Sequence, residues 1–185
     1  LEVWPQVHSV VLDPQQPDQL KWSWEKDGEF SARSAYAANF AALQCSPMAT
    51  YTWASKTPLR CRFFAWLALR DRVWTSDRLA RRGLPHKEAC PFCDQSGETI
   101  NHLMTQCVFA KEVWTKVGQA VGMTGTTPSN SEDLVTWCTK PLFEGRHAKT
   151  LRAIHLLVMW ELWKHRNAIV FEGMRLDEQH ILRRI

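Results

Sequence analysis

The chain has 185 residues, a formal net charge of +4 and 45% hydrophobic residues, a composition that excludes wholesale disorder and suits one ordinary domain with an extension. Ten residues are tryptophan, so a chain of modest length can build a heavy aromatic core. No apolar stretch approaches the length of a membrane span, and no secretory signal is visible. Because the chain begins with Leu1, we expect it to be a piece of a longer protein.

The first predicted elements are a small β-hairpin and a helix. Leu20, Trp22 and Trp24 alternate with polar residues, and Asp27-Gly28 supplies a turn, so residues 20–31 predict the hairpin. Residues 32–43 are rich in helix formers and predict a helix, and residues 44–49 predict a loop.

The rest of the chain is predicted to be helical. Apolar periodicity, caps and breakers place helices at residues 58–70, 76–83 with Ser76 as N-cap, 109–121, 132–138, 147–171 and 176–185. We expect a fold that is mostly α with a small β-hairpin. The predicted organisation is an N-terminal extension (1–19), a domain (20–123), a linker (124–131) and a C-terminal helical segment (132–185). Most of the tryptophans are expected in the core: Trp22, Trp24, Trp53, Trp66, Trp114, Trp160 and Trp163.

A cluster of metal-binding residue types occupies the middle of the chain. Cys90-Pro-Phe-Cys93 is followed by His102 and Cys107, a spacing typical of a structural Zn²⁺ site that has four protein ligands and no open position. His86 or Asp94 is an alternative to His102 as the third ligand. A further alternative makes Cys90 and Cys93 a redox pair and leaves His102 and Cys107 in the core.

A catalytic zinc site of the deaminase type is rejected. His86-Lys-Glu88 lies only one residue before Cys90, which leaves no room for the elements that separate these motifs in deaminases. The other cysteines, Cys45, Cys61 and Cys138, are interpreted as small buried hydrophobic residues. Reduced thiols fit a nuclear or cytoplasmic location.

The positive charge is concentrated between residues 56 and 87, where nine cations accompany only Asp71 and Asp77. Such a segment indicates binding to a polyanion, with a solvated helix face as the alternative. The two aspartates are expected to form salt bridges or a cap. The candidate nucleic-acid contacts are Arg60, Arg62, Arg70, Arg72, Arg78, Arg81, Arg82 and Lys87.

An ordered series of motifs resembles the zinc-binding domain that follows the reverse transcriptase in plant non-LTR (LINE-type) retrotransposons. The series spans roughly residues 20–173. Its members include Trp22-Ser-Trp24, Gly28-Glu-Phe30-Ser31, Phe63-Phe64, Arg81-Arg82-Gly83, Cys90-Pro-Phe-Cys93, Glu98-Thr99-Ile-Asn-His102, Cys107, Trp114 and Trp160-Glu-Leu-Trp163. The resemblance implies Cys90, Cys93, His102 and Cys107 as ligands of Zn²⁺.

This resemblance implies a non-catalytic accessory module that binds template RNA or target DNA. No Tyr-x-Asp-Asp motif and no carboxylate set for Mg²⁺ is found, so no catalytic residue is assigned. The expected partners are nucleic acid and the reverse transcriptase and RNase H domains of the same parent chain, with no membrane and no small-molecule substrate. The alternatives are a protein-docking module that uses the apolar stretch 151–163, and a structural spacer.

Roles are also predicted for three further residues. Phe92 either packs over the metal site or is exposed and stacks on an unpaired base. Arg33 and Arg166 are interpreted as structural, pairing with carboxylates or capping carbonyls.

Overall fold

The computed structural model describes residue 15 and residues 20–40, 46–122, 127–129, 132–140 and 147–185. The chain divides into two compact units, Leu1–Gln44 and Cys45–Ile185. The second unit contains the cysteine cluster and most of the helices.

The described part of the first unit is a turn followed by helix α2 (Ala32–Phe40). The backbone N–H of Trp22 donates to the carbonyl of Gly28 over 2.7 Å, and the Trp22 indole donates to the Ser34 hydroxyl over 2.8 Å. Ser31 caps the start of the helix, because its hydroxyl accepts from the backbone N–H of Ser34 at 3.0 Å.

The structure has this turn in place of the predicted β-hairpin, so the hairpin prediction is wrong. Residues 20–31 contain no strand, although Gly28 takes the positive φ of +75° that a tight turn requires. Two strands alone are marginal in water. Trp24 and Phe30 are 56% and 67% exposed, so this segment lacks the buried face that would stabilise a ribbon.

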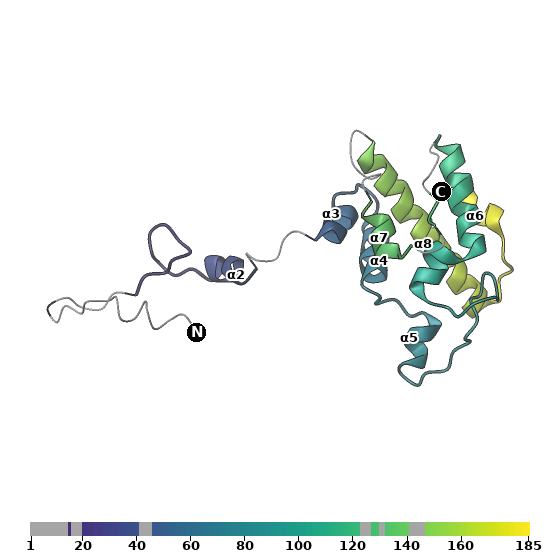
Figure 1. The fold of residues 1–185 in the computed structure, drawn as a ribbon, viewed down its shortest axis with the longest axis horizontal. Coiled ribbons are helices and arrows are strands. Elements are labelled where there is room, and N and C mark those ends of the chain that lie inside the picture. The colour runs from purple at the N-terminus through teal and green to yellow at the C-terminus, as the bar shows by residue number, and fades with distance from the viewer. Residues whose placement is uncertain (1–14, 16–19, 41–45, 123–126, 130–131, 141–146) are drawn as a thin grey trace. The chain divides into compact units, whose positions relative to one another are not determined.

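The second unit is almost entirely helical (Figure 1). Its elements, in chain order, are α3 (Pro47–Trp53), α4 (Leu59–Leu69), α5 (Ser76–Ala80), the π-helical turn η1 (His102–Gln106), α6 (Val108–Ala120), α7 (Leu134–Cys138), α8 (Ala148–Glu172) and α9 (Glu178–Leu182). Among the described residues, the β structure is limited to one isolated bridge between Ala89 and Gly97.

Helix α3 corrects the predicted loop at residues 44–49. Residues 44 and 45 lie outside the described ranges, but Pro47 begins a helix in its first turn. Proline is favoured there because the first helical N–H has no intrahelical partner and the fixed φ suits a helix. The N-cap of α5 is also corrected, from Ser76 to Thr75.

Helix α8 is the central element of the second unit and packs against α3, α4 and α9 (Figure 1). Ala65 and Ala68 of α4 are almost fully buried. Phe64 lies between Trp160 and Trp163 of α8, with ring centroids 5.7 and 5.4 Å away. Helix α8 ends at Gly173, whose φ of +66° is the left-handed conformation common after a helix.

A second cluster of rings joins α6, α7 and α8. Trp114 and Trp137 meet edge to face at 4.7 Å, and His155 lies 4.9 and 4.8 Å from their centroids. Both tryptophans are 1% exposed, so each removes a large apolar surface from water. Helices on both sides of residues 124–131 therefore share one core. The predicted domain boundaries within 20–185 remain predictions.

None of the helices in the described ranges is long and apolar enough to cross a membrane.

Candidate metal centre and basic surface

The first two cysteines lie on a short loop that its own backbone closes. The N–H of Cys90 donates to the carbonyl of Ser96 over 2.8 Å, and that of Asp94 donates to the carbonyl of Cys90 over 2.9 Å. Asp94 has a φ of +54°, a conformation that aspartate tolerates better than most residues. The bridge between Ala89 and Gly97 closes the loop behind these bonds. Both thiols are thereby held on one turn.

The other two donors come from η1 and the start of α6. The N–H of Cys107 donates to the carbonyl of His102 over 2.7 Å, which is the i+5 bond of a π-turn. The Thr99 hydroxyl accepts from the N–H of His102 at 3.0 Å. Cys107 is the N-cap residue of α6. Such π-turns often occur at functional sites, and this one places His102 and Cys107 beside the loop.

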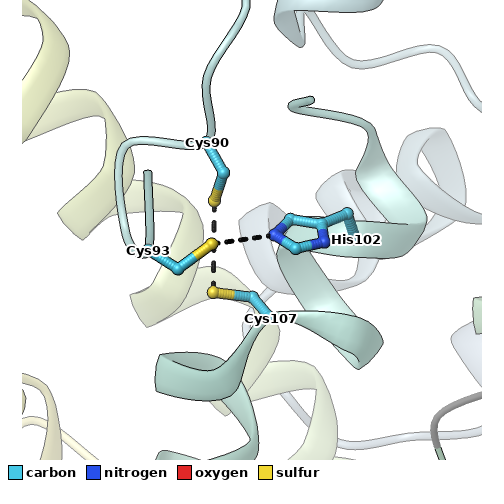
Figure 2. Close-up of side chains that lie close together, drawn as sticks. All are labelled: Cys90, Cys93, His102 and Cys107. Carbon is cyan, nitrogen blue, oxygen red and sulfur yellow. Dashed lines mark hydrogen bonds between the residues drawn. The ribbon is translucent and has the colours of Figure 1, made fainter. Parts of the chain in front are cut away.

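Together the four side chains form one compact donor cluster (Figure 2). The sulfur and nitrogen atoms of Cys90, Cys93, His102 and Cys107 all lie within 4.8 Å of one another. The Cys90 and Cys107 sulfurs are 4.0 Å apart, and the Cys93 sulfur is 3.2 Å from His102 Nε2. Tetrahedral zinc with Zn–S bonds of about 2.3 Å requires sulfurs roughly 3.8 Å apart. The residues present therefore fit Zn²⁺, and the cluster is placed to bind a metal ion.

A hydrogen bond between two of the thiols, together with burial, shifts the pKa values of these donors. The Cys90 thiol donates to Cys107 and is buried, and both effects raise the pKa of Cys90. The same hydrogen bond lowers the pKa of Cys107. Burial lowers the pKa of His102, with a smaller contribution from Lys111. A neutral imidazole is the form that binds metal.

The alternative ligands are not part of this cluster. His86 is exposed and its Nδ1 lies 2.8 Å from the carbonyl of Leu84, in its own loop. The close group contains neither His86 nor Asp94. With three sulfurs and one imidazole the shell is complete, which is characteristic of a structural rather than a catalytic site.

Phe92 packs inward instead of facing solvent. Its side chain is 5% exposed and its ring centroid lies 5.0 Å from that of Phe109 and 6.2 Å from that of His165. The packing interpretation of Phe92 is therefore confirmed, and stacking on a base is excluded in this conformation.

A buried ion pair fastens the metal loop to α8. Arg166 donates from Nε and Nη2 to the two carboxylate oxygens of Glu98, over 2.6 and 2.7 Å. The side chains are 3% and 1% exposed. The N–H of Ser76 also donates to this carboxylate, at 3.0 Å, so the start of α5 shares the same anchor. The structural interpretation of Arg166 is confirmed. No local pattern around Arg166 or Glu98 indicates that they are partners.

Several of the predicted nucleic-acid contacts form hydrogen bonds or ion pairs with aspartates of the protein itself. The Arg78 guanidinium donates to the backbone carbonyl and the carboxylate of Asp71, and Arg81 pairs with both Asp71 and Asp77. The expected salt bridges of these aspartates are confirmed. They reduce the positive charge that α5 offers to a ligand.

Three other arginines lie over tryptophan rings. The guanidinium carbons of Arg62, Arg70 and Arg82 are 6.0, 4.9 and 4.7 Å from the centroids of Trp53, Trp66 and Trp74, respectively. The remaining predicted contacts are exposed: Arg60, Arg72 and Lys87.

The exposure of the tryptophans corrects part of the predicted core. Trp114 is buried as predicted, but Trp24 and Trp53 are 56% and 40% exposed. Trp137, which the sequence did not single out, is 1% exposed. Its short amphipathic helix, α7, contains too few residues to show which face is buried.

Comparison with known proteins gives two matches. Residues 30–114 match the family described as zinc-binding in reverse transcriptase. A protein of Arabidopsis thaliana, whose name places it provisionally among the ribonuclease H proteins, is 27% identical over 174 residues. That match covers 90% of this chain but only 28% of the relative. No solved structure matches.

Proposed function

We propose that this chain is a zinc-stabilised accessory module that binds RNA or DNA and performs no chemistry of its own, since residues 30–114 match the family described as zinc-binding in reverse transcriptase. The single observation that carries the proposal is the cationic segment 56–87, in which nine cations accompany two anions. Lysine and arginine bind phosphate without regard to sequence.

The metal cluster supports this function as a scaffold. Three thiolates and one imidazole leave Zn²⁺ with a formal charge of −1, so the cluster itself does not attract phosphate. Bound metal would hold the loop 90–93 against η1 and the start of α6, since the other two ligands are His102 of η1 and Cys107, the N-cap residue of α6. The Glu98–Arg166 pair then links this loop to α8.

The cations are not equivalent as phosphate ligands. Arg78 and Arg81 share their charge with Asp71 and Asp77, whereas residues 56–70 include Lys56, Arg60, Arg62 and Arg70 and no acidic residue. We therefore assign the larger share of phosphate binding to the cations of 56–70.

Salt-dependent binding tests the proposal. Fluorescence anisotropy of labelled RNA and DNA oligonucleotides, measured with the zinc-loaded chain at 50 and 200 mM salt, should show affinity that falls steeply with salt. Replacing Arg60 and Arg62 with Gln should weaken binding and lower the salt slope by about 0.7 to 0.9 per lost phosphate contact. Arg175→Gln is the matched control, because Arg175 is exposed and lies outside the cationic segment. No detectable binding at low salt would refute the function.

A second candidate is protein docking, but at a different surface from the predicted stretch 151–163. That stretch is occupied, because Leu156, Met159 and Leu162 are fully buried in the core. The observation that favours docking is a groove of about 570 Å³ between the loop before the cysteines and the end of α8. Its lining includes Pro85, Ala89, Pro91, Ile169 and the 77% exposed Phe171.

The partner that we propose for this groove is the reverse transcriptase part of the parent protein. Co-purification of that part with the chain, reduced by Phe171→Ala and unaffected by Phe63→Ala, would support docking. Equal recovery with both variants would refute it.

A further inference from the structure

The outward face of α4 is apolar and basic, which is unusual for a surface helix. Leu59, Phe63, Trp66 and Arg70 follow one another at helical spacing along one side. Cys61, Phe64, Ala65 and Ala68 occupy the opposite, buried side. A helix that is apolar on both sides is normally enclosed, so the composition of the outward side needs a reason other than folding.

The two aromatic rings on this face stack on each other, and Phe63 is exposed whereas Trp66 is half-buried. Phe63 is 52% exposed and Leu59 is 63% exposed. The rings of Phe63 and Trp66 stack with centroids 6.0 Å apart and an interplanar angle of 21°. Neither ring belongs to the hydrophobic core cluster or to the residues packed against it. Together the stacked rings form an aromatic platform whose exposed ring is that of Phe63.

Two arginines at α4, one within the helix and one at its C-terminal cap, stack on tryptophan rings. Arg70 lies over Trp66 at 4.9 Å and Arg62 lies over Trp53 at 6.0 Å. The stack on Trp66 holds the Arg70 guanidinium against the platform, and both stacks leave the guanidinium able to bind an anion. No acidic residue occurs in α4, so the charge that α4 itself contributes to this face is positive.

This combination fits unpaired nucleotides better than a duplex. Single-stranded nucleic acid is bound by aromatic side chains on which bases stack, within a positively charged track for the backbone. In a duplex the bases are already stacked on each other, so the arginines would bind phosphates and the rings would contribute nothing. Protein partners are less favoured, because the cations would need matching carboxylates as well as an apolar surface.

We infer that the outward face of α4 binds single-stranded RNA or DNA, with an unpaired base stacking on the exposed ring of Phe63, against which Trp66 is stacked, and with phosphates bound by Arg62 and Arg70. This inference rests on the proposed nucleic-acid function and specifies its ligand. It also places binding on α4 rather than on the arginines of α5, whose charge is shared with aspartates.

The test compares strands with and without bases. Anisotropy is measured with the zinc-loaded 185-residue chain on a labelled single strand, on an abasic strand of the same length, and on a duplex. Phe63→Ala should weaken binding to the base-bearing strand by about 5-fold to 150-fold, the range expected for one stacked base. It should leave the abasic strand, the duplex and the salt slope unchanged.

Two controls separate stacking from damage to the fold. Phe171→Ala removes a ring that is also highly exposed, 77% against 52% for Phe63, and should leave all three affinities unchanged. Phe63→Tyr keeps the ring and should restore binding to the base-bearing strand. Zinc content and thermal midpoint are measured for each variant, so that an unfolded variant is recognised.

The outcomes distinguish this inference from the proposed function. If Phe63→Ala and the wild type bind the base-bearing strand equally while Arg62→Gln weakens all ligands, nucleic-acid binding stands and the inference is overturned. If the wild type binds the abasic strand as tightly as the base-bearing one, stacking is likewise excluded. If no oligonucleotide binds at low salt, the proposed function itself fails.

Discussion

Replacement of Arg166 by Met should destabilise the folded chain more than any surface substitution. Arg166 and Glu98 form a bidentate pair with side chains 3% and 1% exposed. Met removes the charge and preserves most of the volume, so the carboxylate of Glu98 remains buried with only the donors of Ser76. Breaking a buried pair from one side costs about 3 to 5 kcal/mol, because the remaining charge is not solvated.

Urea unfolding followed by circular dichroism, with zinc present and at pH 7, measures this loss. The matched control is Arg175→Met, at an exposed position, where we expect a change within about 0.5 kcal/mol. The double variant with Glu98→Gln should lose less than the sum of the two single variants, because it buries no unpaired charge. A loss below about 1 kcal/mol for Arg166→Met, or strict additivity in the double variant, would refute the reasoning.

Two further predictions concern stability. Burial lowers the pKa of His155 to about 3, whereas the unfolded value is about 6.5. Below pH 6.5 the unfolded chain therefore binds a proton that the folded chain does not, and stability falls by about 1.4 kcal/mol per pH unit. His155→Phe should make urea midpoints less pH-dependent between pH 6.5 and 5, and parallel curves would contradict this. Gly173→Ala should cost about 1 to 2 kcal/mol, because φ is +66° there. Gly97→Ala, where the added Cβ meets only a carbonyl oxygen at 3.9 Å, should be nearly neutral, and equal losses would exclude backbone strain as the cause.

The sequence predicted what depends on neighbours along the chain. Residues 58–70 and 147–171 were expected as helices, and the structure forms α4 and α8 within one or two residues of those bounds. The four clustered metal donors were also predicted, because a short cysteine loop followed by His and Cys has few other uses. Local spacing was sufficient in each case.

What the sequence did not predict depends on distant contacts. Glu98 and Arg166 are 68 positions apart, and nothing near either residue indicates the other. The hairpin prediction was wrong because the alternation of apolar and polar residues shows only which face of a strand would be apolar. A stable strand also needs a surface against which that face packs. The sequence also did not predict that arginines stack on Trp53, Trp66 and Trp74. Whether these tryptophans are exposed depends on which faces of the helices are covered by the core.

Zinc content, with the coordination shell determined by X-ray absorption at the zinc edge, tests the central claim most directly. We predict one zinc per chain, bound by three sulfurs and one nitrogen, in the wild type and in Cys61→Ala, which removes a buried cysteine outside the cluster. Cys93→Ala should lose the metal and lower the thermal midpoint. Absence of stoichiometric zinc from the wild type, or a shell without sulfur, would contradict the account.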